Sequence, residues 1–370
     1  MSAVASAKWA TFLRLPLPLE GGPGLRCTGA ASRATTRPES PDSVTLPQDL
    51  ERAVEALRRG QLVAFPTETV YGLGADAENA AAVARVFSAK GRPTNHPLIV
   101  HVASADDLAR WARRVPPAAT RLAEACWPGP LTLLLEKSSR VPDATTGGLP
   151  SVGLRVPAHP VALELLRRFG GGIAAPSANR FGHVSPTTAA HVREDLGDSV
   201  EVLLDGGTCG VGVESTIVDL THDTPVLLRP GGVTAERIES LLGVTLERHA
   251  PEGVRAPGML ASHYAPRARV ELIDGAQLVA RAAQLKQQGE RVAVLVSRSD
   301  DREALSALGD VTLLDLGSSD DHAAQRLYSA LRQADVDNAS VVLASRPVAQ
   351  GLGAALADRL TKAAGPRQPT

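Results

Sequence analysis

Strand-sized apolar runs alternate with helix-patterned segments along the C-terminal part of this chain, from residue 269 to 370. The apolar runs lie at Val270–Ile273, Val292–Val296, Val311–Leu316 and Val341–Ala344. Consecutive parallel strands need a long crossover between them, and that crossover is usually a helix. The alternation therefore predicts a small α/β domain built on a doubly wound parallel sheet.

A second set of apolar runs lies between residues 47 and 243. The predicted strands are Gln61–Phe65, Leu98–Val102, Leu131–Leu135, Val152–Val156, Gly172–Ala175, Val202–Leu204, Ser215–Leu220 and Val226–Leu228. One helical pattern places Leu50, Val54 and Leu57 on the same face, and Gly60 is placed to end that helix. Further helical patterns lie at Ala80–Ala89, Ala105–Arg113, Val161–Phe169, Thr188–Leu196 and Thr234–Leu242. Some neighbouring runs are too close for a crossover helix, so we expect a mixed sheet flanked by helices.

The remaining segments complete the expected organisation. A length of 370 residues fits two domains at about 150 residues each. Residues 244–268 are rich in Pro and Gly, which indicates a linker. Residues 1–46 contain arginines, few acids and several Pro and Gly residues, so we expect a disordered extension. This extension is compatible with an organelle transit peptide, and equally with an upstream extension or a misassigned start.

Composition narrows the function classes. With 39 Lys and Arg against 40 Asp and Glu, the net charge of −1 demands no polyanionic partner. Aromatic residues make up only 3%, which leaves few stacking platforms for single-stranded RNA. The chain has no apolar run of about 18 residues, so we expect no membrane span.

Cysteine usage points to a reducing compartment. Cys27, Cys126 and Cys209 are far apart and form no Cys-x-x-Cys pair, which supports neither a disulfide framework nor a thiolate zinc site. His-Glu-x-x-His and similar spacings are also missing, so we predict no metal site and a cytoplasmic location.

A turn with hydroxyls, a carboxylate and glycines follows the first predicted strand, at Pro66–Gly74. The carboxyl ends of strands are where α/β sheets bind ligands, so this turn is a candidate site. Gly72-x-Gly74-x-x-Ala77 also nominally matches a dinucleotide fingerprint, and Arg92 lies near the spacing expected for a residue that binds the 2′-phosphate of NADP. That pattern leaves two interpretations open, an NADP-dependent oxidoreductase or a glycine-rich turn that needs positive φ.

Two cations separated by a glycine, Lys90 and Arg92, offer hydrogen-bond donors to a small anion or a polyphosphate. The alternative is a solvated basic loop. His101 lies inside a predicted strand, where a lone histidine is usually structural. Arg155 also lies in a strand-like run, where it needs an anion, from a ligand or from a structural ion pair.

The segment Ala175–Thr187 places hydroxyls and an amide, expected to be exposed, before a predicted helix. Such a segment can bind phosphate oxygens, although Thr187 or Thr188 can also simply cap the helix. The chain contains no Walker loop and no Gly-x-Ser-x-Gly elbow, so the sequence supports neither a P-loop triphosphate site nor serine hydrolysis.

Taken together and in order, six segments closely resemble the YrdC-like threonylcarbamoyl-AMP synthase family. They are Pro66–Gly74, Lys90–Val102, Ser151–Pro157, Ala175–Ser185, Glu214–Asp219 and Leu228–Gly232. Ala256–Pro266, followed by a small α/β domain, resembles the long two-domain form of that family. The resemblance implies a YrdC-like mixed twisted sheet over 47–243, a linker and possible lid over 244–268, and a Rossmann-like domain over 269–370.

The resemblance also implies an activity. Members condense L-threonine, bicarbonate and ATP, with Mg2+, to threonylcarbamoyl-adenylate and pyrophosphate, the first step of threonylcarbamoyladenosine synthesis on tRNA. The product then passes to the tRNA-modifying transferase machinery, and whether it is handed over directly, and whether this chain touches tRNA, stay open.

Site residues carried over from the family motifs fall into three groups. Those expected around threonine are Thr69, His101, Arg155, Ala175 through its backbone, and Ser215. Those expected around the nucleotide are Arg92, His96, Ser151, Ser177, Ser185, Arg229 and Tyr264. Those expected at the bicarbonate and phosphate end are Lys90, Arg92, Ser177 and Asn179. His96 stands where many members carry Asn, and Ser151 where many carry Thr.

Several anions must meet in such a site, so we expect electrostatic catalysis by Lys90 and Arg92, helped by Arg155 and Arg229. Glu68 or Glu214 can act as a general base, bind Mg2+ or be structural, and the sequence does not choose among these roles. Tyr264 lies in the linker, which suggests a lid over the pocket.

Two alternatives to the synthase remain besides the NADP enzyme. The first is a non-catalytic YrdC-like RNA-binding module. The second, a carbamoyltransferase of hydrogenase maturation, is disfavoured because it should bring zinc-finger cysteines that this chain lacks.

Overall fold

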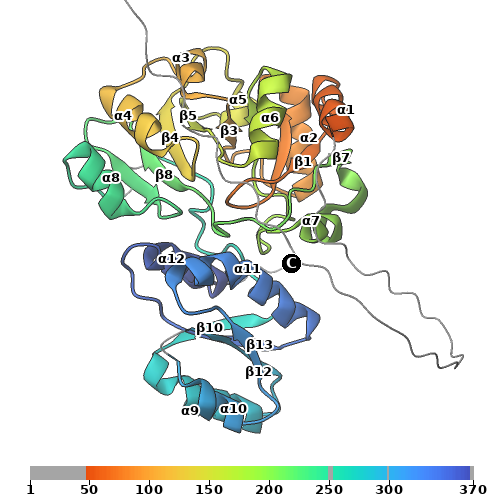
Figure 1. Cartoon of the computed structure of the whole chain (residues 1–370), viewed down its shortest axis with the longest axis vertical. Helices are drawn as coiled ribbons and strands as arrows, with labels where there is room; N and C mark the ends of the chain where they lie inside the picture. Colours follow the sequence, from red (N-terminus) through yellow and green to blue (C-terminus); the bar gives the residue numbers. More distant parts are fainter. Residues whose placement is uncertain (1–46, 249–252, 298–299, 367–370) are drawn as a thin grey trace, which may run out of the picture. The chain divides into compact units, whose positions relative to one another are not determined.

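Two separate β-sheets organise the part of the chain that the structure, a computed structural model, describes: residues 47–248, 253–297 and 300–366. The larger sheet has nine strands in the order β7-β1-β2-β6-β3-β5-β4-β8-β9, and the smaller has four in the order β10-β13-β11-β12 (Figure 1). The extension predicted over residues 1–46 lies outside the described residues.

The larger sheet is mixed. Its strands are β1 (Val63–Phe65), β2 (Gly72–Asp76), β3 (Ile99–His101), β4 (Leu131–Glu136), β5 (Ser151–Arg155), β6 (Ile173–Ala174), β7 (Val202–Leu203), β8 (Thr216–Asp219) and β9 (Val226–Arg229). β3 pairs parallel with β5, and β4 pairs antiparallel with β5 but parallel with β8. The predicted mixed sheet is therefore confirmed.

Helices accompany this sheet as predicted, with two additions. They are α1 (Pro47–Arg58), α2 (Ala80–Lys90), α3 (Leu108–Trp111), α4 (Pro117–Cys126), α5 (Asp143–Thr146), α6 (Pro160–Phe169), α7 (Ala189–Leu196) and α8 (Ala235–Leu242). Sequence analysis missed α4 and α5. Helix α4 opens on Pro117, a position where proline fits because its missing N–H has no intrahelical acceptor.

Strand β2 corrects two interpretations of its glycines. Gly72 and Gly74 lie inside the strand, antiparallel to β1, and neither has a positive φ. Their small size is needed for packing, because a Cβ on Gly74 would lie 2.7 Å from Cγ2 of Ile173. A dinucleotide turn joins a strand directly to a helix, whereas α2 begins only at Ala80, so the NADP interpretation is wrong.

The two faces of the larger sheet have different covers. Val100 packs into a core with Val86 of α2 and Leu122 of α4. Successive side chains of a strand point to opposite faces, so Ile99 and His101 of β3 face the other side. Helices α1 and α6 cover part of that side. Ile99 itself packs in a smaller apolar cluster with linker residues, including Ala256.

The smaller sheet is parallel throughout, which confirms the doubly wound prediction. Its strands are β10 (Arg269–Ile273), β11 (Val292–Val296), β12 (Thr312–Asp315) and β13 (Val341–Ser345). Helices α9 (Leu278–Gln287) and α10 (Arg302–Ala307) lie on one face, and α11 (Asp320–Val336) and α12 (Gly353–Ala363) on the other (Figure 1).

The domain limits at residues 243 and 269 stay predictions. Among the described residues, no helix has the length and apolar character needed to cross a membrane.

Candidate active site

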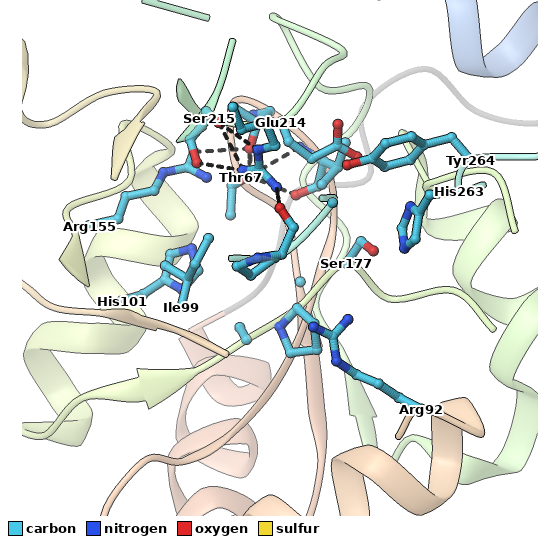
Figure 2. Close-up of a pocket in the computed structure, with 18 residues that line it drawn as sticks. Thr67, Arg92, Ile99, His101, Arg155, Ser177, Glu214, Ser215, His263 and Tyr264 are labelled. Atoms are coloured by element: carbon cyan, nitrogen blue, oxygen red, sulfur yellow. Dashed lines mark hydrogen bonds between the residues drawn. The ribbon is translucent and has the colours of Figure 1, made fainter. Parts of the chain in front are cut away.

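A small cavity of about 50 Å3 lies where the strand ends of the larger sheet meet the linker. Nine residues predicted from sequence line it: Thr69, Arg92, His101, Arg155, Ala175, Ser177, Ser215, Arg229 and Tyr264. His101 and Arg155 are register partners at the ends of the parallel strands β3 and β5. Figure 2 shows them at one end of the pocket, with Arg92, His263 and Tyr264 at the other.

Arg155 is buried and only partly engaged by protein groups. Its Nη2 donates to Oε1 of Glu68 at 2.7 Å and to Oγ1 of Thr69 at 2.9 Å, and its Nε donates to the carbonyl of Gly129 at 3.3 Å. Within the described ranges, Nη1 has no protein acceptor. A guanidinium held from one side in this way can still bind a carboxylate in the cavity.

His101 is neutral in this setting. Burial, followed by the charge of Arg155, lowers its pKa to about 3. Its Nδ1 is buried and has no hydrogen-bond partner among the described residues. A cavity-lining ring of this kind can exchange a hydrogen bond with a ligand without adding charge.

Two further wall segments offer oxygens to a ligand. Oγ1 of Thr67 lies 2.8 Å from Oγ1 of Thr69 and donates to the carbonyl of Val70 at 2.6 Å, which fixes the turn. The backbone N–H of Ala175 donates to the carbonyl of Ile99 at 2.9 Å. Of its two backbone polar groups, only the carbonyl of Ala175 can therefore hydrogen-bond a ligand.

Arg92 is held at the other end of the cavity. Its Nη2 donates to the carbonyl of Pro97 at 3.0 Å, and its Cζ lies 5.7 Å from the ring centre of Phe181. Nε is buried without a partner in the described part of the chain. Burial lowers the pKa of Arg92 to about 10, so the group stays protonated at neutral pH.

Arg229 joins strand β9 to Ser215 and to the linker. Its Nε and Nη2 donate to the carbonyl of Ser215 at 3.0 and 2.8 Å, and its Nη1 donates to that of Pro257 at 3.1 Å. The cavity is thus lined by three guanidinium groups and one carboxylate, that of Glu214. Buried charges of one sign need compensation, so this cavity favours an anionic ligand.

Tyr264 brings the linker into the site. It is buried, its backbone φ is +61°, and its hydroxyl has no partner among the described residues. A positive φ at a non-glycine residue costs of order 1 kcal/mol or more and persists only where the surroundings hold it. The hydroxyl lies against Gly258, where a Cβ would come within 2.4 Å of it.

Comparisons with known proteins agree with this geometry. Residues 55–231 match a family model described as "Telomere recombination", and residues 233–365 match one described as "Threonylcarbamoyl-AMP synthase, C-terminal domain". Curated threonylcarbamoyl-AMP synthases of Pyrococcus abyssi and Bacillus subtilis are 45% and 40% identical, over 84% and 86% of this chain and 92% and 93% of theirs. The chain belongs to the threonylcarbamoyl-AMP synthase family.

A solved structure extends the likeness to the fold. A crystal structure of P. abyssi Sua5 complexed with L-threonine matches with a TM-score of 0.79 and 43% identity, over 85% of this chain and 94% of that one. Family membership confirms the resemblance drawn from the six segments, the two-domain form, and the nucleotidyltransferase class of enzyme. It favours the expected synthase over the RNA-binding alternative.

Two family residues expected at the phosphate end lie behind the cavity wall. Nζ of Lys90 is buried and donates to the carbonyls of Ser177 and Asn179 at 2.6 and 2.5 Å. Burial, followed by the charge of Arg92, lowers the pKa of Lys90 well below its usual value. Nδ2 of Asn179 donates to the carbonyls of Arg180 and His183. In this conformation both side chains hold the loop that carries Ser177.

Ser185 and the two candidate general bases have internal partners. Ser185 is fully buried, not exposed as expected, and donates to Glu214 at 2.7 Å. The other oxygen of Glu214 accepts from Tyr328 and Arg359. Glu68 accepts from Arg155 and from the N–H of Ala158. In this structure both carboxylates accept hydrogen bonds from protein groups, which favours the structural role among the alternatives left open by the sequence.

His96 and Ser151 lie outside the small cavity. The half-buried His96 contacts the edge of the Phe181 ring, with 5.5 Å between ring centres. Burial lowers the pKa of His96. Ser151, at the start of β5, lines a second cavity of about 590 Å3 together with Lys137 and Asp219.

Sequence reasoning missed several residues of the wall. His263 lines the cavity directly before Tyr264, and Pro257 and Gly258 line it from the same linker. All three lie in the segment that resembles the long form of the family, so their place in that motif was the available signal. Arg359 and Tyr328 gave no such signal, because they lie on helices far along the chain.

Proposed function

We propose that this protein joins L-threonine, bicarbonate and ATP into threonylcarbamoyl-adenylate and pyrophosphate. The observation that carries the proposal is the excess of buried guanidinium groups at the cavity: three line it, against the carboxylate of Glu214 in the lining and that of Glu68, which pairs with Arg155. Threonine, its carbamate and ATP are all anionic or zwitterionic, and a site that gathers them needs such an excess.

Threonine binds at the end formed by Arg155 and His101. The free Nη1 of Arg155 receives the carboxylate, while Ala175 offers a carbonyl to the ammonium group and Ser215 and Thr69 offer hydroxyls. His101, being neutral, adds a hydrogen bond and no repulsion toward the ammonium group.

The nucleotide lies along strand β5 toward Ser151. Ser151, Gly153 and Arg155 alternate along the strand, so they face the same side of the sheet. Gly153 carries no side chain between them, and the strand spans about 13 Å at roughly 3.3 Å per residue. This track joins the threonine end to the second cavity, which has room for a nucleoside.

Cationic and polar groups surround the phosphates of the bound nucleotide. Arg92, Arg229, Ser177, Ser185, His96 and Tyr264 form this part of the site, and Lys90 and Asn179 support it through the loop at residue 177. We assign Lys90 and Arg92 to stabilising charge on bicarbonate and phosphate oxygens, Lys90 after a rearrangement of the loop that it now holds.

Mg2+ enters as part of the MgATP substrate. The described residues contain no cluster of three or more His, Cys, Asp or Glu side chains that could hold a metal ion. Mg2+ commonly keeps several waters and binds through substrate phosphates, so a protein cage is unnecessary. With both nearby carboxylates engaged, no general base is assigned.

The chemical step balances without covalent catalysis. Bicarbonate releases hydroxide to give CO2, and the neutral threonine amine adds to that CO2. The proton that the nitrogen then loses combines with the hydroxide as water, which leaves a carbamate. A carbamate oxygen then attacks the α-phosphorus of ATP and pyrophosphate leaves. The protein contributes orientation and charge stabilisation to both steps.

The linker acts as a lid. Its residues Pro257, Gly258, His263 and Tyr264 close the cavity, which at about 50 Å3 holds no more than a few water molecules. ATP is far larger, so the linker must move before it binds. Its return excludes water from a labile adenylate.

Downstream, the product feeds the transferase that modifies tRNA, and we place the protein in the cytoplasm. Cys126 and Cys209 are free thiols, which fits a reducing compartment.

One assay tests the proposal. The full chain is incubated with ATP, threonine, labelled bicarbonate and Mg2+, and the products are separated by chromatography. We expect a labelled adenylate that requires threonine and bicarbonate together. Salt-dependent RNA binding with no labelled adenylate would instead favour the RNA-binding alternative.

A further inference from the structure

A buried ion pair joins the C-terminal domain to the cavity wall. Arg359 of α12 is fully buried, and its Nε donates to Oε2 of Glu214 at 2.6 Å. Tyr328 of α11 donates to the same oxygen at 2.8 Å. Glu214 lines the cavity and directly precedes Ser215, so this carboxylate connects the two domains at the site itself.

The same guanidinium contacts a second wall segment. Nη2 of Arg359 donates to the carbonyl of Pro230 at 3.1 Å. Pro230 directly follows Arg229, whose own guanidinium bonds the carbonyl of Ser215. One planar fork therefore holds the strand end that carries Arg229 and the residue before Ser215 at a fixed separation.

Arg359 also supports the linker. Its Cζ lies 5.1 Å from the ring centre of Tyr264, and that ring stacks on Tyr328 with 5.8 Å between centres and an angle of 29° between planes. Tyr264 has the strained positive φ, and these contacts are what hold its ring in place.

The electrostatics of the buried carboxylate favour this contact. Burial alone would raise the pKa of Glu214, but the charges of Arg359 and Arg229 and the hydrogen bonds from Ser185 and Arg359 lower it to about 2. Glu214 is thus ionised. Without Arg359 it would be a buried carboxylate with fewer cations and hydrogen-bond donors around it. Removing one member of such a pair is strongly destabilising.

We propose that Arg359 is a positioning residue of the synthase, which fixes three wall segments of the cavity from the C-terminal domain. The C-terminal domain is then a structural part of the nucleotide end of the site. The proposal rests on the function proposed above for this cavity.

The decisive variant is Arg359→Lys in the full chain. Lysine keeps the positive charge for Glu214 but lacks the planar fork that reaches Pro230 and stacks on Tyr264. We expect KM for ATP to rise about tenfold, while Kd for threonine, measured without ATP, rises by less than about threefold, because Ser215 is the one threonine-end residue next to Glu214 and Arg359 contacts neither Arg155 nor His101. A purely structural role would lower the folded fraction, and hence kcat, with KM unchanged.

Two further variants complete the test. Tyr328→Phe removes one donor to Glu214 and no charge, and we expect KM for ATP to rise about threefold. Arg326→Lys on the same helix α11 is the matched control. Its guanidinium pairs with Asp315 and is half exposed, so its kinetics should match those of the wild type.

The outcomes separate the two proposals. Wild-type KM for ATP in Arg359→Lys overturns the positioning role, and so does wild-type KM in Tyr328→Phe if Arg359→Lys fails to fold. A wild-type protein that makes no labelled adenylate overturns the proposed function instead.

Discussion

Nζ of Lys90 donates a hydrogen bond to the carbonyl oxygen of Ser177 at 2.6 Å, across 87 positions of sequence. The ammonium group thus does not line the cavity itself but supports the backbone that forms part of its wall. A lysine that the sequence suggests as an anion ligand is, in this conformation, the support of a neighbouring loop.

Replacing either cation of the Lys90 and Arg92 pair should stop catalysis. We expect Lys90→Ala and Arg92→Ala each to lose pyrophosphate release that depends on threonine and bicarbonate, by at least about 100-fold, since each removes charge stabilisation or its support. Circular dichroism should show that both variants fold. Arg85→Ala, an exposed position on the same helix α2, is the control. Wild-type turnover in both variants would remove the anion site.

Arg155 should be sensitive even to a conservative change. Arg155→Lys keeps the charge but loses the fork that meets Glu68, Thr69 and a carboxylate together. We expect Kd for threonine, measured by calorimetry without ATP, to rise about tenfold. Arg110→Lys, at a partly exposed ion pair with Glu78, should bind threonine as the wild type does. Equal affinity in Arg155→Lys and wild type would place the threonine carboxylate elsewhere.

Closure of the linker can be tested with two glycines of the same backbone conformation. Gly258 and Gly289 have φ values of +82° and +80°, but a Cβ at 258 meets the hydroxyl of Tyr264 at 2.4 Å and one at 289 meets nothing within 4 Å. Gly258→Val should therefore hold the linker open and let the adenylate hydrolyse. We expect its yield of intact product per ATP consumed to fall about tenfold, against little change in Gly289→Val. The same yield in both variants would argue against a lid.

Acid stability should depend on His101. Its pKa is about 3 in the folded protein against an ordinary value of 6.5, so the unfolded chain binds this proton first as pH falls. The stability that follows is fully present above pH 6.5 and is lost progressively toward pH 3. Each such proton contributes a slope of about 1.4 kcal/mol per pH unit.

His101→Asn should reduce the pH dependence of the free energy of unfolding by the contribution of one proton. Urea unfolding between pH 6.5 and 4.5 measures it, and this window lies above the range in which Glu214 begins to contribute, from its ordinary value of 4.5 down to about 2. His263 and His191, with pKa values of about 3 and 4, and His96 and His159, whose pKa values burial also lowers, contribute to the slope that remains. An unchanged slope in the variant would mean that His101 is already protonated in the folded state.

Local patterns predicted most of the fold. Periodicity located eight of the nine strands of the larger sheet and all four of the smaller one. Strand β2 was missed because Gly72 and Gly74 look like turn residues, and only the three-dimensional closeness of Ile173 explains them. Tertiary packing overrides local propensity at such positions.

The site was predictable to a similar extent, and for the same reason. Polar residues at strand ends, such as His101 and Arg155, converge because parallel strands share one edge. The ion pair of Glu214 with Arg359 joins residues 145 positions apart, and no spacing in the sequence indicates it. Long-range pairs of this kind are set by how two domains dock.

The alternation along β3 separates two kinds of mutational effect at adjacent positions. Val100 belongs to the core shared with α2 and α4, whereas its neighbour His101 belongs to the cavity. Damage at the first position would reduce how much protein a cell keeps, and damage at the second would reduce what each molecule accomplishes. In a saturation-mutagenesis screen that scores abundance and growth separately, these two neighbouring codons should therefore fall on different axes.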